Sequence, residues 1–380
     1  MKRTLSLAAL SAVVMLALSG CSQQPTPGAE TPSGAASEST EIQAVDGCGE
    51  EADFSLASDV EAGPARCEPG APAAIALDEP AKVTIAIASQ TGDYAAPYFV
   101  GIQEGEFEAE GIDLEIQVLP TRDALPLVAG GQLDGLASAN SAGVYNSVSQ
   151  GVQMRMLLGQ GWIAEDSLAG VWARGGDTEV EDLGPGTKFG SAVGAGSAAN
   201  VDLFRKAEEV GVDMKGFEYI VVAPADTVLA LQNGSVDAAM ILDPFWLELE
   251  NDPDFHRLAS SVPAGSDNGG FWGGPSLLDR PDVAAAFVRA YVRTVNTYFS
   301  GDYKADAENL EIISAATGVE PDAIARTPSF VFNWDVPTEM TDAHQEMFID
   351  LGESPYATPL PEDELVDRSF VETAVGRERP

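Results

Sequence analysis

The sequence predicts an α/β fold made of two similar lobes, each built from a β-α-β-α-β unit. The first observation is an internal repeat: DALPLVAGGQLDGLASAN, which begins at Asp123, aligns without a gap with DTVLALQNGSVDAAMILD, which begins at Asp226. The second is that short apolar segments alternate with amphipathic segments of helical length around both copies. Repetition of one unit indicates a duplicated fold, and strands that alternate with helices favour parallel sheets with helices on both faces.

Each copy of the repeat predicts a short helix followed directly by a strand. The acidic residue that opens each copy is expected to cap the helix, and a glycine is expected to end it. An apolar strand follows, at 133–139 in the first copy and 236–242 in the second. The aligned pairs are Asp123 with Asp226, Gly131 with Gly234, Asp134 with Asp237, and Asn140 with Asp243.

Segments on either side of the repeat complete the two lobes. Upstream strands are expected at 82–88, 112–119, 188–193 and 217–222, with helices at about 97–110 and 197–210. Right-handed crossovers would place the loops that follow the strands along one edge of each sheet. Further helices are expected at 281–299, about 304–316, about 320–326 and about 338–351, packed on the first lobe. We therefore assign 81–170 with 263–380 to lobe I, and 171–262 to lobe II.

The N-terminal segment has the layout of a secretory signal. Two basic residues precede an apolar run at 5–18, and small residues then lead into Cys21. The ending Leu-Ser-Gly-Cys resembles the bacterial lipobox, in which the cysteine is diacylated; an ordinary signal peptide with a chance cysteine is the alternative. We expect a lipoprotein signal peptide at 1–20 and a lipid anchor on Cys21. A disordered tether is expected at 21–45, which has few bulky apolar side chains.

The acidic extension at 46–80 carries the two remaining cysteines, Cys48 and Cys67. In an oxidising compartment a disulfide between them is the simplest interpretation, and two free thiols are the alternative. No metal site is predicted, because no histidine lies nearby. The formal net charge of the chain is -40, which argues against nucleic acid and anionic membrane surfaces as partners and agrees with solubility in a salty or acidic habitat.

A ligand site is expected beyond the carboxyl ends of the strands, where open parallel sheets bind their ligands. The loop at Gly196-Ser197 would open onto a serine-capped helix and present free N–H groups to an acceptor; plain helix capping is the alternative. Asp243 lies where the first copy has Asn140, and it could either accept hydrogen bonds from a ligand or cap a turn with Pro244. Aromatic residues of the predicted loops would wall a pocket for a small organic solute, or pack in the core.

The predicted ligand-binding residues come from both lobes. They are Gln90, Tyr94, Ser138, Asn140, Ser141, Trp162, Gly196, Ser197, Asp243, Trp246, Phe271 and Trp272. No cationic side chain is clearly assigned to this set, so the charge of the solute stays open. The absence of a cationic clamp and the aromatic loops favour a flat or sulfonate-bearing organic solute over a bare inorganic anion.

Several stretches resemble the solute-binding proteins of nitrate, sulfonate, taurine and thiamine-precursor importers. They are YAAPYFVGIQEGEFEAEGIDLEIQVL (94–119), GQLDG (131–135), NGSVDAAMILDPFW (233–246) and LLDRPDVAAAFVRAYVR (277–293). The resemblance covers about 82–300 and implies a two-lobed type II periplasmic-binding-protein fold that closes on its ligand about a hinge. It also implies a monomer that delivers its solute to the membrane permease of an ABC importer, with no cofactor. Leu242-Asp243-Pro244 departs from the Trp-Glu-Pro common in the family, which leaves the ligand class in doubt.

Two other classes of function compete with solute binding. A related enzyme builds a pyrimidine by consuming its own histidine, but it needs a suitably placed histidine and a cysteine-rich iron motif. Here the only histidines are His256 and His344, both in charged, helix-like settings, and there is no cysteine cluster. Other catalytic motifs are missing from the sequence. A surface sensor or adhesion lipoprotein would share the anchor and tether but does not explain the glycine loop of the repeat.

Overall fold

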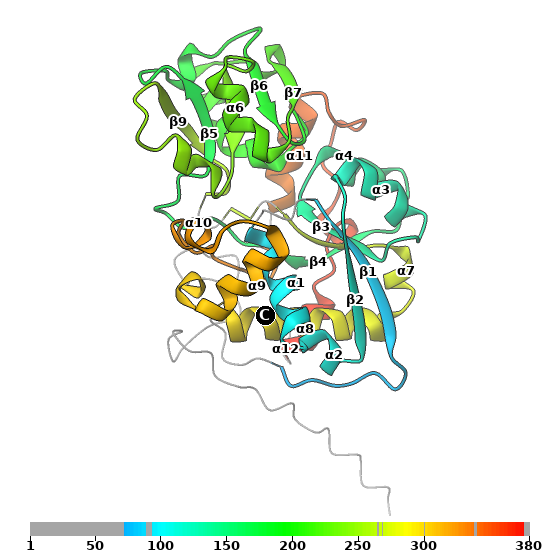
Figure 1. The fold of residues 1–380 in the computed structure, drawn as a ribbon. Coiled ribbons are helices and arrows are strands. Elements are labelled where there is room, and N and C mark those ends of the chain that lie inside the picture. The colour runs from blue at the N-terminus through cyan, green and yellow to red at the C-terminus, as the bar shows by residue number, and fades with distance from the viewer. Residues whose placement is uncertain are drawn as a thin grey trace, which may run out of the picture. The chain divides into compact units, whose positions relative to one another are not determined.

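The computed structural model describes residues 72–88, 93–263, 266–267, 269–299, 301–337 and 340–375, all within one compact unit of the chain. The predictions for the signal peptide, the tether, Cys21, Cys48, Cys67 and Gln90 lie outside these residues. Figure 1 shows the described elements as ribbons. None of the helices in these ranges is long and apolar enough to span a membrane.

The first sheet has five strands in the order β2-β1-β3-β10-β4. Its strands are β1 (Ala81–Ile87), β2 (Ile112–Val118), β3 (Gly135–Ala139), β4 (Arg155–Gly159) and β10 (Gly269–Gly273). Strand β1 pairs in parallel with β2 and β3, whereas β10 lies antiparallel to both β3 and β4. The late strand β10 therefore brings the chain back into a sheet that the first part of the sequence started.

The second sheet repeats this arrangement in the order β7-β6-β8-β5-β9. Its strands are β5 (Gly170–Arg174), β6 (Lys188–Ser191), β7 (Glu218–Val221), β8 (Ala238–Ile241) and β9 (Phe255–Ser260). Here β6 pairs in parallel with β7 and β8, and β5 lies antiparallel to β8 and β9. Each strand of one sheet thus has a counterpart at the same position in the other.

Helices surround the strands and carry most of the remaining core. They are α1 (Ala96–Gln103), α2 (Glu106–Ala109), α3 (Thr121–Ala129), α4 (Ala142–Ser149), α5 (Val201–Val210), α6 (Thr227–Gln232), α7 (Pro275–Leu278), α8 (Pro281–Tyr298), α9 (Ala307–Thr317), α10 (Pro321–Ala325), α11 (Met340–Asp350) and α12 (Ser369–Val375). Four of the 3-10 turns matter below: η4 (Asp93–Ala95), η6 (Ala198–Asn200), η9 (Phe245–Glu248) and η10 (Tyr303–Ala305).

The predicted fold class is confirmed: each lobe is an α/β unit with one five-stranded sheet, and the strand order is the same in both. The expectation of purely parallel sheets is wrong, because the antiparallel strands β5 and β10 were not predicted. Both contain a glycine at which the neighbouring backbone comes very close. A Cβ at Gly170 would lie 2.0 Å from the Ala259 carbonyl oxygen, and one at Gly270 would lie 2.0 Å from that of Leu158. These glycines make a central strand resemble a loop in sequence.

Other predicted elements differ only in their limits. The single helix expected at about 97–110 is divided into α1 and α2, because Gly105 adopts a left-handed conformation with φ 76°. Asp123 lies inside the first turn of α3, whose N-cap residue is Pro120. Asp226 does occupy the N-cap position of α6, without a side-chain hydrogen bond.

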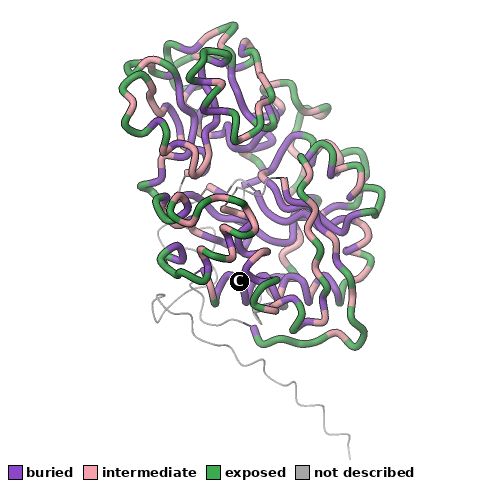
Figure 2. The backbone as a smooth tube through the Cα atoms, viewed as in Figure 1, coloured by how far each residue is buried: buried purple, intermediate pink, exposed green. Residues whose placement is uncertain are grey.

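The core of the first sheet centres on α8, which packs against α1, α2 and α12 (Figure 1). An aromatic cluster joins the helices to the sheet: the ring of Phe271 lies 4.4 Å from that of Phe287 and 6.5 Å from that of Tyr98. Figure 2 shows the buried stretches running along the strands of both sheets. On the same side, the buried Glu110 pairs with Arg289 and Arg293 of α8, and Arg289 also bonds the Ile75 carbonyl. These contacts hold residues 72–77 against α2 and α8.

Candidate functional site

Residues that follow the strands meet at the edge where a ligand was expected. Ser141 and Ser197 form an isolated antiparallel bridge there; Ser141 follows β3 of the first sheet and Ser197 follows β6 of the second. The N–H of Ala142 donates to the Gly196 carbonyl at 2.9 Å, and the N–H of Ala198 donates to the Asn140 carbonyl at 3.0 Å. The glycine loop therefore uses these backbone groups to join the two lobes. Helix α5 begins only at Val201, so Ser197 does not cap it.

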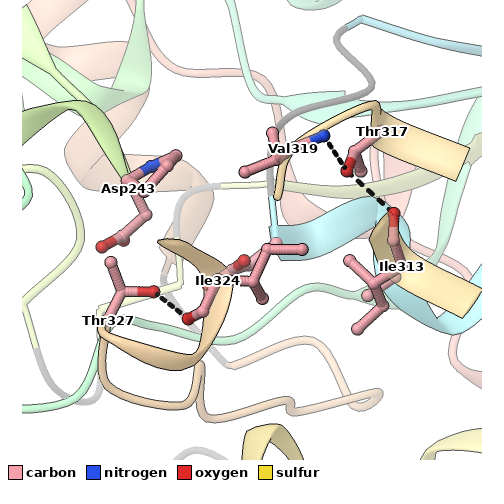
Figure 3. Close-up of a pocket in the computed structure, with 9 residues that line it drawn as sticks. Asp243, Ile313, Thr317, Val319, Ile324 and Thr327 are labelled. Atoms are coloured by element: carbon pink, nitrogen blue, oxygen red, sulfur yellow. Dashed lines mark hydrogen bonds between the residues drawn. The ribbon is translucent and has the colours of Figure 1, made fainter. Parts of the chain in front are cut away.

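A recess with two carboxylates lies just after the end of β8, and we call it the acid recess. It encloses about 330 Å³, including space open to solvent. Its lining residues come from η4 and α1, from the end of β8, and from the C-terminal helices: Asp93, Ala96, Asp243, Pro244, Ile313, Thr317, Val319, Ile324 and Thr327. Figure 3 shows the side chain of Asp243 directed toward Thr327 across this space. The recess therefore combines an acidic end with aliphatic walls.

The Asp243 carboxylate is partly buried, and its negative charge is only partly compensated. Its Oδ1 accepts a hydrogen bond from the indole N–H of Trp246 at 2.6 Å. Burial and, to a smaller extent, the nearby charge of Asp93 together raise the pKa of Asp243 to about 6, while Lys304 and the hydrogen bonds from Trp246 and Ser167 act in the opposite direction. Near neutral pH the group is thus an anion that its surroundings only partly compensate.

The second carboxylate, Asp93, is held by a buried lysine. The Nζ of Lys304 donates to Asp93 Oδ2 at 2.7 Å, to Thr327 Oγ1 at 2.7 Å and to the Pro328 carbonyl at 3.0 Å. Lys304 is only 3% exposed. An ammonium group has three protons to donate, so these three bonds use its full capacity. Lys304 therefore positions Asp93 without offering a donor to the recess.

A second recess lies on the other side of η4, and we call it the tyrosine recess. It spans about 150 Å³ when space open to solvent is included, and it is lined by Tyr94, Tyr98, Ala137, Gly159, Gln160, Gly270 and Tyr291. The rings of Tyr98 and Tyr291 lie 4.9 Å apart. Burial raises the pKa of both phenols well above the ordinary value, so both stay neutral. Gln160 is 7% exposed, and its Oε1 has no hydrogen-bond partner within the described ranges.

The loop that carries Gln160 is fixed by a fully buried carboxylate. Asp267 Oδ2 accepts the backbone N–H groups of Gln160 at 2.7 Å and Gly161 at 2.6 Å, and its Oδ1 accepts that of Gly269 at 3.0 Å. Asp267 thereby joins the end of β4 to the start of β10. An acceptor such as Gln160 Oε1, held beside a recess without a partner, is what a ligand donor would satisfy.

A family model described as "NMT1/THI5 like" matches residues 93–300, more than half of the 380-residue chain. The chain belongs to the NMT1/THI5-like family. The match confirms the resemblance found in the sequence, and it includes both η4 and β8, which supply the two carboxylates. A search of curated proteins found no match.

Solved structures with this fold include members of the same broad group at low identity. The periplasmic nitrate-binding protein NrtA from Synechocystis PCC 6803 is 16% identical, with a TM-score of 0.59, over 80% of this chain and 90% of that one. The alkanesulfonate-binding protein SsuA from Xanthomonas axonopodis pv. citri, bound to MOPS, is also 16% identical, with a TM-score of 0.56, over 74% and 97%. The desulfurization enzyme DSZB is 14% identical, with a TM-score of 0.50, over 78% and 99%. The fold is therefore shared by binding proteins and an enzyme.

The predicted ligand-binding residues of this family member fall into separate groups. Tyr94 lines the tyrosine recess, and Asp243 lines the acid recess with Trp246 bonded to it. Ser141, Gly196 and Ser197 lie at the bridge between the lobes, and Trp162 forms another bridge, with Val331. Ser138 is buried, and its Oγ has no partner among the described residues.

Three of the predicted residues lie deep in the core. Phe271 and Trp272 belong to β10 instead of a loop, and both side chains are fully buried. The indole N–H of Trp272 donates to Asn140 Oδ1 at 2.9 Å, and Asn140 Nδ2 lies 3.4 Å from Nδ1 of His344. In these contacts the side chains bond to other residues of the same core, so we leave the three side chains out of the proposed site below.

Sequence reasoning missed most of the residues that complete the two recesses. Gln160 could have been found, since it directly follows β4, whose residues Met156, Leu157 and Leu158 form an apolar segment of strand length. Lys304, Thr327 and Tyr291 carried no such signal, because they lie on the C-terminal helices and their connections. Over the described ranges, no group of three or more His, Cys, Asp or Glu side chains is arranged to hold a metal ion.

Proposed function

We propose that the chain is the extracytoplasmic solute-binding component of an ABC importer, and that it captures a small organic solute without catalysis. The observation that carries the proposal is the acid recess at the carboxyl end of β8, where η4, β8 and the C-terminal helices meet around a partly buried, partly compensated carboxylate. Buried charge of this kind is costly to the fold and is typical of functional sites. The tyrosine recess, with the unpartnered Gln160 Oε1, supplies an adjoining aromatic surface.

The partners and location belong to the same proposal. We infer a lipid anchor on Cys21, a tether over 21–45, a disulfide between Cys48 and Cys67, and delivery of the solute to a membrane permease by a monomeric protein. Lobe I would comprise 81–170 with 263–380 and lobe II 171–262, and closure about the bridge at Ser141 and Ser197 would enclose the solute. The sequence signals described above support these assignments.

A thermal-shift screen of the purified chain tests solute binding directly. The panel contains alkanesulfonates, nitrate, pyrimidines, flavins and small amines. A solute present at 100 times its Kd stabilises the folded state by about 2.7 kcal/mol, which raises the melting temperature by several degrees. If no member of the panel shifts the melting temperature, the binding function is wrong.

The position of the site is tested with a matched pair of variants. Val319 lines the acid recess and is partly exposed, so Val319→Trp fills the recess with little disturbance of the core. Val210 is 40% exposed at the end of α5, outside both recesses, and Val210→Trp is the control. We expect the first variant to lose the thermal shift and the second to keep it. Equal shifts in both variants would place the solute elsewhere.

A further inference from the structure

The side-chain polar groups that line the acid recess are all acceptors in their present bonding. Two of them are the carboxylates of Asp93 and Asp243. The other two are threonine hydroxyls whose protons are already donated to backbone carbonyls: Thr317 to Ile313 at 2.8 Å and Thr327 to Ile324 at 2.9 Å (Figure 3). A hydroxyl that donates its proton elsewhere can only accept from a ligand. Among the described residues that line this recess, a solute therefore meets side-chain acceptors and no side-chain donor.

The cations near the recess do not change this character. Lys304 spends its three protons on Asp93, Thr327 and Pro328. Arg257 of β9 does not line the recess; its Nη2 donates to the Ala169 carbonyl at 3.1 Å, and its strongest favourable charge contact is Asp202, ahead of Asp243. The raised pKa of Asp243 means that this carboxyl group binds a proton more tightly than an aspartic acid in water does. A ligand cation placed beside Asp243 would offset part of the cost of burying this carboxylate, in addition to what Lys304 and Arg257 already offset.

We propose that the acid recess binds the protonated nitrogen group of an amine or amidine, placed between the Asp93 and Asp243 carboxylates, with the hydrocarbon part against Ile313, Val319 and Ile324. This inference rests on the proposed solute-binding function and specifies its substrate class. It separates the chain from the nitrate- and sulfonate-binding structures that share its fold, whose named ligands are anions or carry a sulfonate. An anion in the acid recess would face two carboxylates without a side-chain donor.

Isothermal titration with three ligands of one shape tests the sign of the charge. Benzamidine, benzamide and benzoate differ chiefly in carrying a positive charge, none, or a negative one. At pH 7.5 we expect benzamidine to bind the full chain at least tenfold more tightly than benzamide, and benzoate to bind more weakly than either. Equal affinities, or preference for benzoate, would overturn the inference.

Variants of one strand identify the carboxylate responsible. Asp243→Asn keeps an oxygen acceptor for Trp246 but removes the charge, and we expect it to weaken benzamidine at least tenfold while changing benzamide less than twofold. Asp237→Asn is the matched control, because Asp237 precedes the same strand and is exposed outside the recess. Loss of benzamidine binding in both variants, or in neither, would contradict the assignment.

The pH dependence supplies a readout that a structural role would not move. Protonation of Asp243 removes the negative charge, so benzamidine affinity of the unchanged chain should fall about tenfold between pH 7.5 and pH 5. The groups that act on Asp243 are Asp93, Lys304, Trp246, Ser167 and Arg257, and the Asp243→Asn variant removes the titration while leaving them in place. The benzamidine affinity of this variant should be constant over this range, and a parallel fall would assign the effect to another group.

If an anionic solute of the thermal-shift panel binds and Asp243→Asn leaves its binding unaffected, this inference fails while the binding function stands. If nothing in the panel binds, both fail.

Discussion

The two lobes are copies of one design that differ at one strand end. In lobe I the backbone N–H of Thr84 donates to Asp134 at 2.8 Å, and in lobe II that of Lys188 donates to the aligned Asp237 at 2.9 Å. The glycines that end the aligned helices, Gly131 and Gly234, both have positive φ, at 68° and 75°. Equivalent residues thus build equivalent turns, and the repeat in the sequence corresponds to hydrogen bonds that recur at the aligned positions of both lobes.

The difference lies in the next aligned pair, Asn140 and Asp243. Each accepts a hydrogen bond from an indole N–H, of Trp272 in lobe I and of Trp246 in lobe II. Asn140 is fully buried and closes a neutral network with His344, whereas Asp243 lines the acid recess. A neutral amide at this position packs in the core, and a carboxylate at the same position lines a recess.

The largest expected effect is a loss of stability at acid pH that is caused by His344 of lobe I. Burial lowers the pKa of His344 from 6.5 to about 3, so the folded protein holds the ring neutral while the unfolded chain takes up a proton near pH 6.5. The stability contributed by this group is present above pH 6.5 and is lost as the pH falls toward 3. Between pH 7 and pH 4 the loss is about 3 kcal/mol. Urea unfolding measures the free energy of unfolding of the unchanged chain and of His344→Gln at both pH values. The difference between the two proteins should change by this amount in favour of the variant at pH 4, and a constant difference would contradict the assignment.

Placing the carboxylate of lobe II at the aligned position of lobe I should lower the free energy of unfolding nearly as much. Asn140→Asp places a carboxylate where the side chain is fully buried, and we expect a loss of about 2–3 kcal/mol in the free energy of unfolding at pH 7. Denaturant titration measures the loss. The deficit should shrink at pH 4, where the new acid is protonated, and a deficit independent of pH would point to a packing defect instead.

The reverse exchange should stabilise the protein. The folded-state pKa of Asp243 is raised from 3.8 to about 6, so its contribution to stability is present below pH 3.8 and is lost as the pH rises through 6. Asp243→Asn mimics the neutral acid and should raise the free energy of unfolding by about 2 kcal/mol at pH 7, with no gain at pH 4. A variant that is less stable at neutral pH would show that the carboxylate serves the fold.

The smallest effect separates the aligned pair Asp134 and Asp237. Asp134 also accepts from Ser276 at 2.7 Å and pairs with Arg280 at 2.6 Å, whereas Asp237 is exposed. Asp134→Asn should lower the free energy of unfolding by about 1 kcal/mol, and Asp237→Asn should change it little. Thermal unfolding of both variants measures the difference; equal losses would mean that only the shared backbone cap contributes.

Much of the fold could be predicted because it depends on patterns among residues that are close together in the sequence. Apolar segments of strand length, helical segments between them and glycines after the helices placed β1, β2, β3, β6, β7 and β8 and the helices between them within a few residues. The strands β5 and β10 escaped prediction, since Gly170 and Gly270 are required by close neighbours that only the folded sheet brings near. Both strands continue with an apolar residue and a tryptophan, Gly-Val-Trp and Gly-Phe-Trp, and in both the register shifts just before the tryptophan. This second repeat is visible in the sequence once the strands are known.

The sequence by itself determined the duplication, the α/β class, the family and the importance of the Asn140 and Asp243 positions, because each depends on residues close together in the chain. Only the tertiary structure decided which of the two lines a recess. Asp93 and Lys304 are 211 residues apart. The threonines that donate to backbone carbonyls lie at the end of α9 and just after α10, and no local pattern specifies what these C-terminal segments pack against. The charges of those distant neighbours act on Asp243, and our proposal that the recess prefers a cationic ligand depends on them.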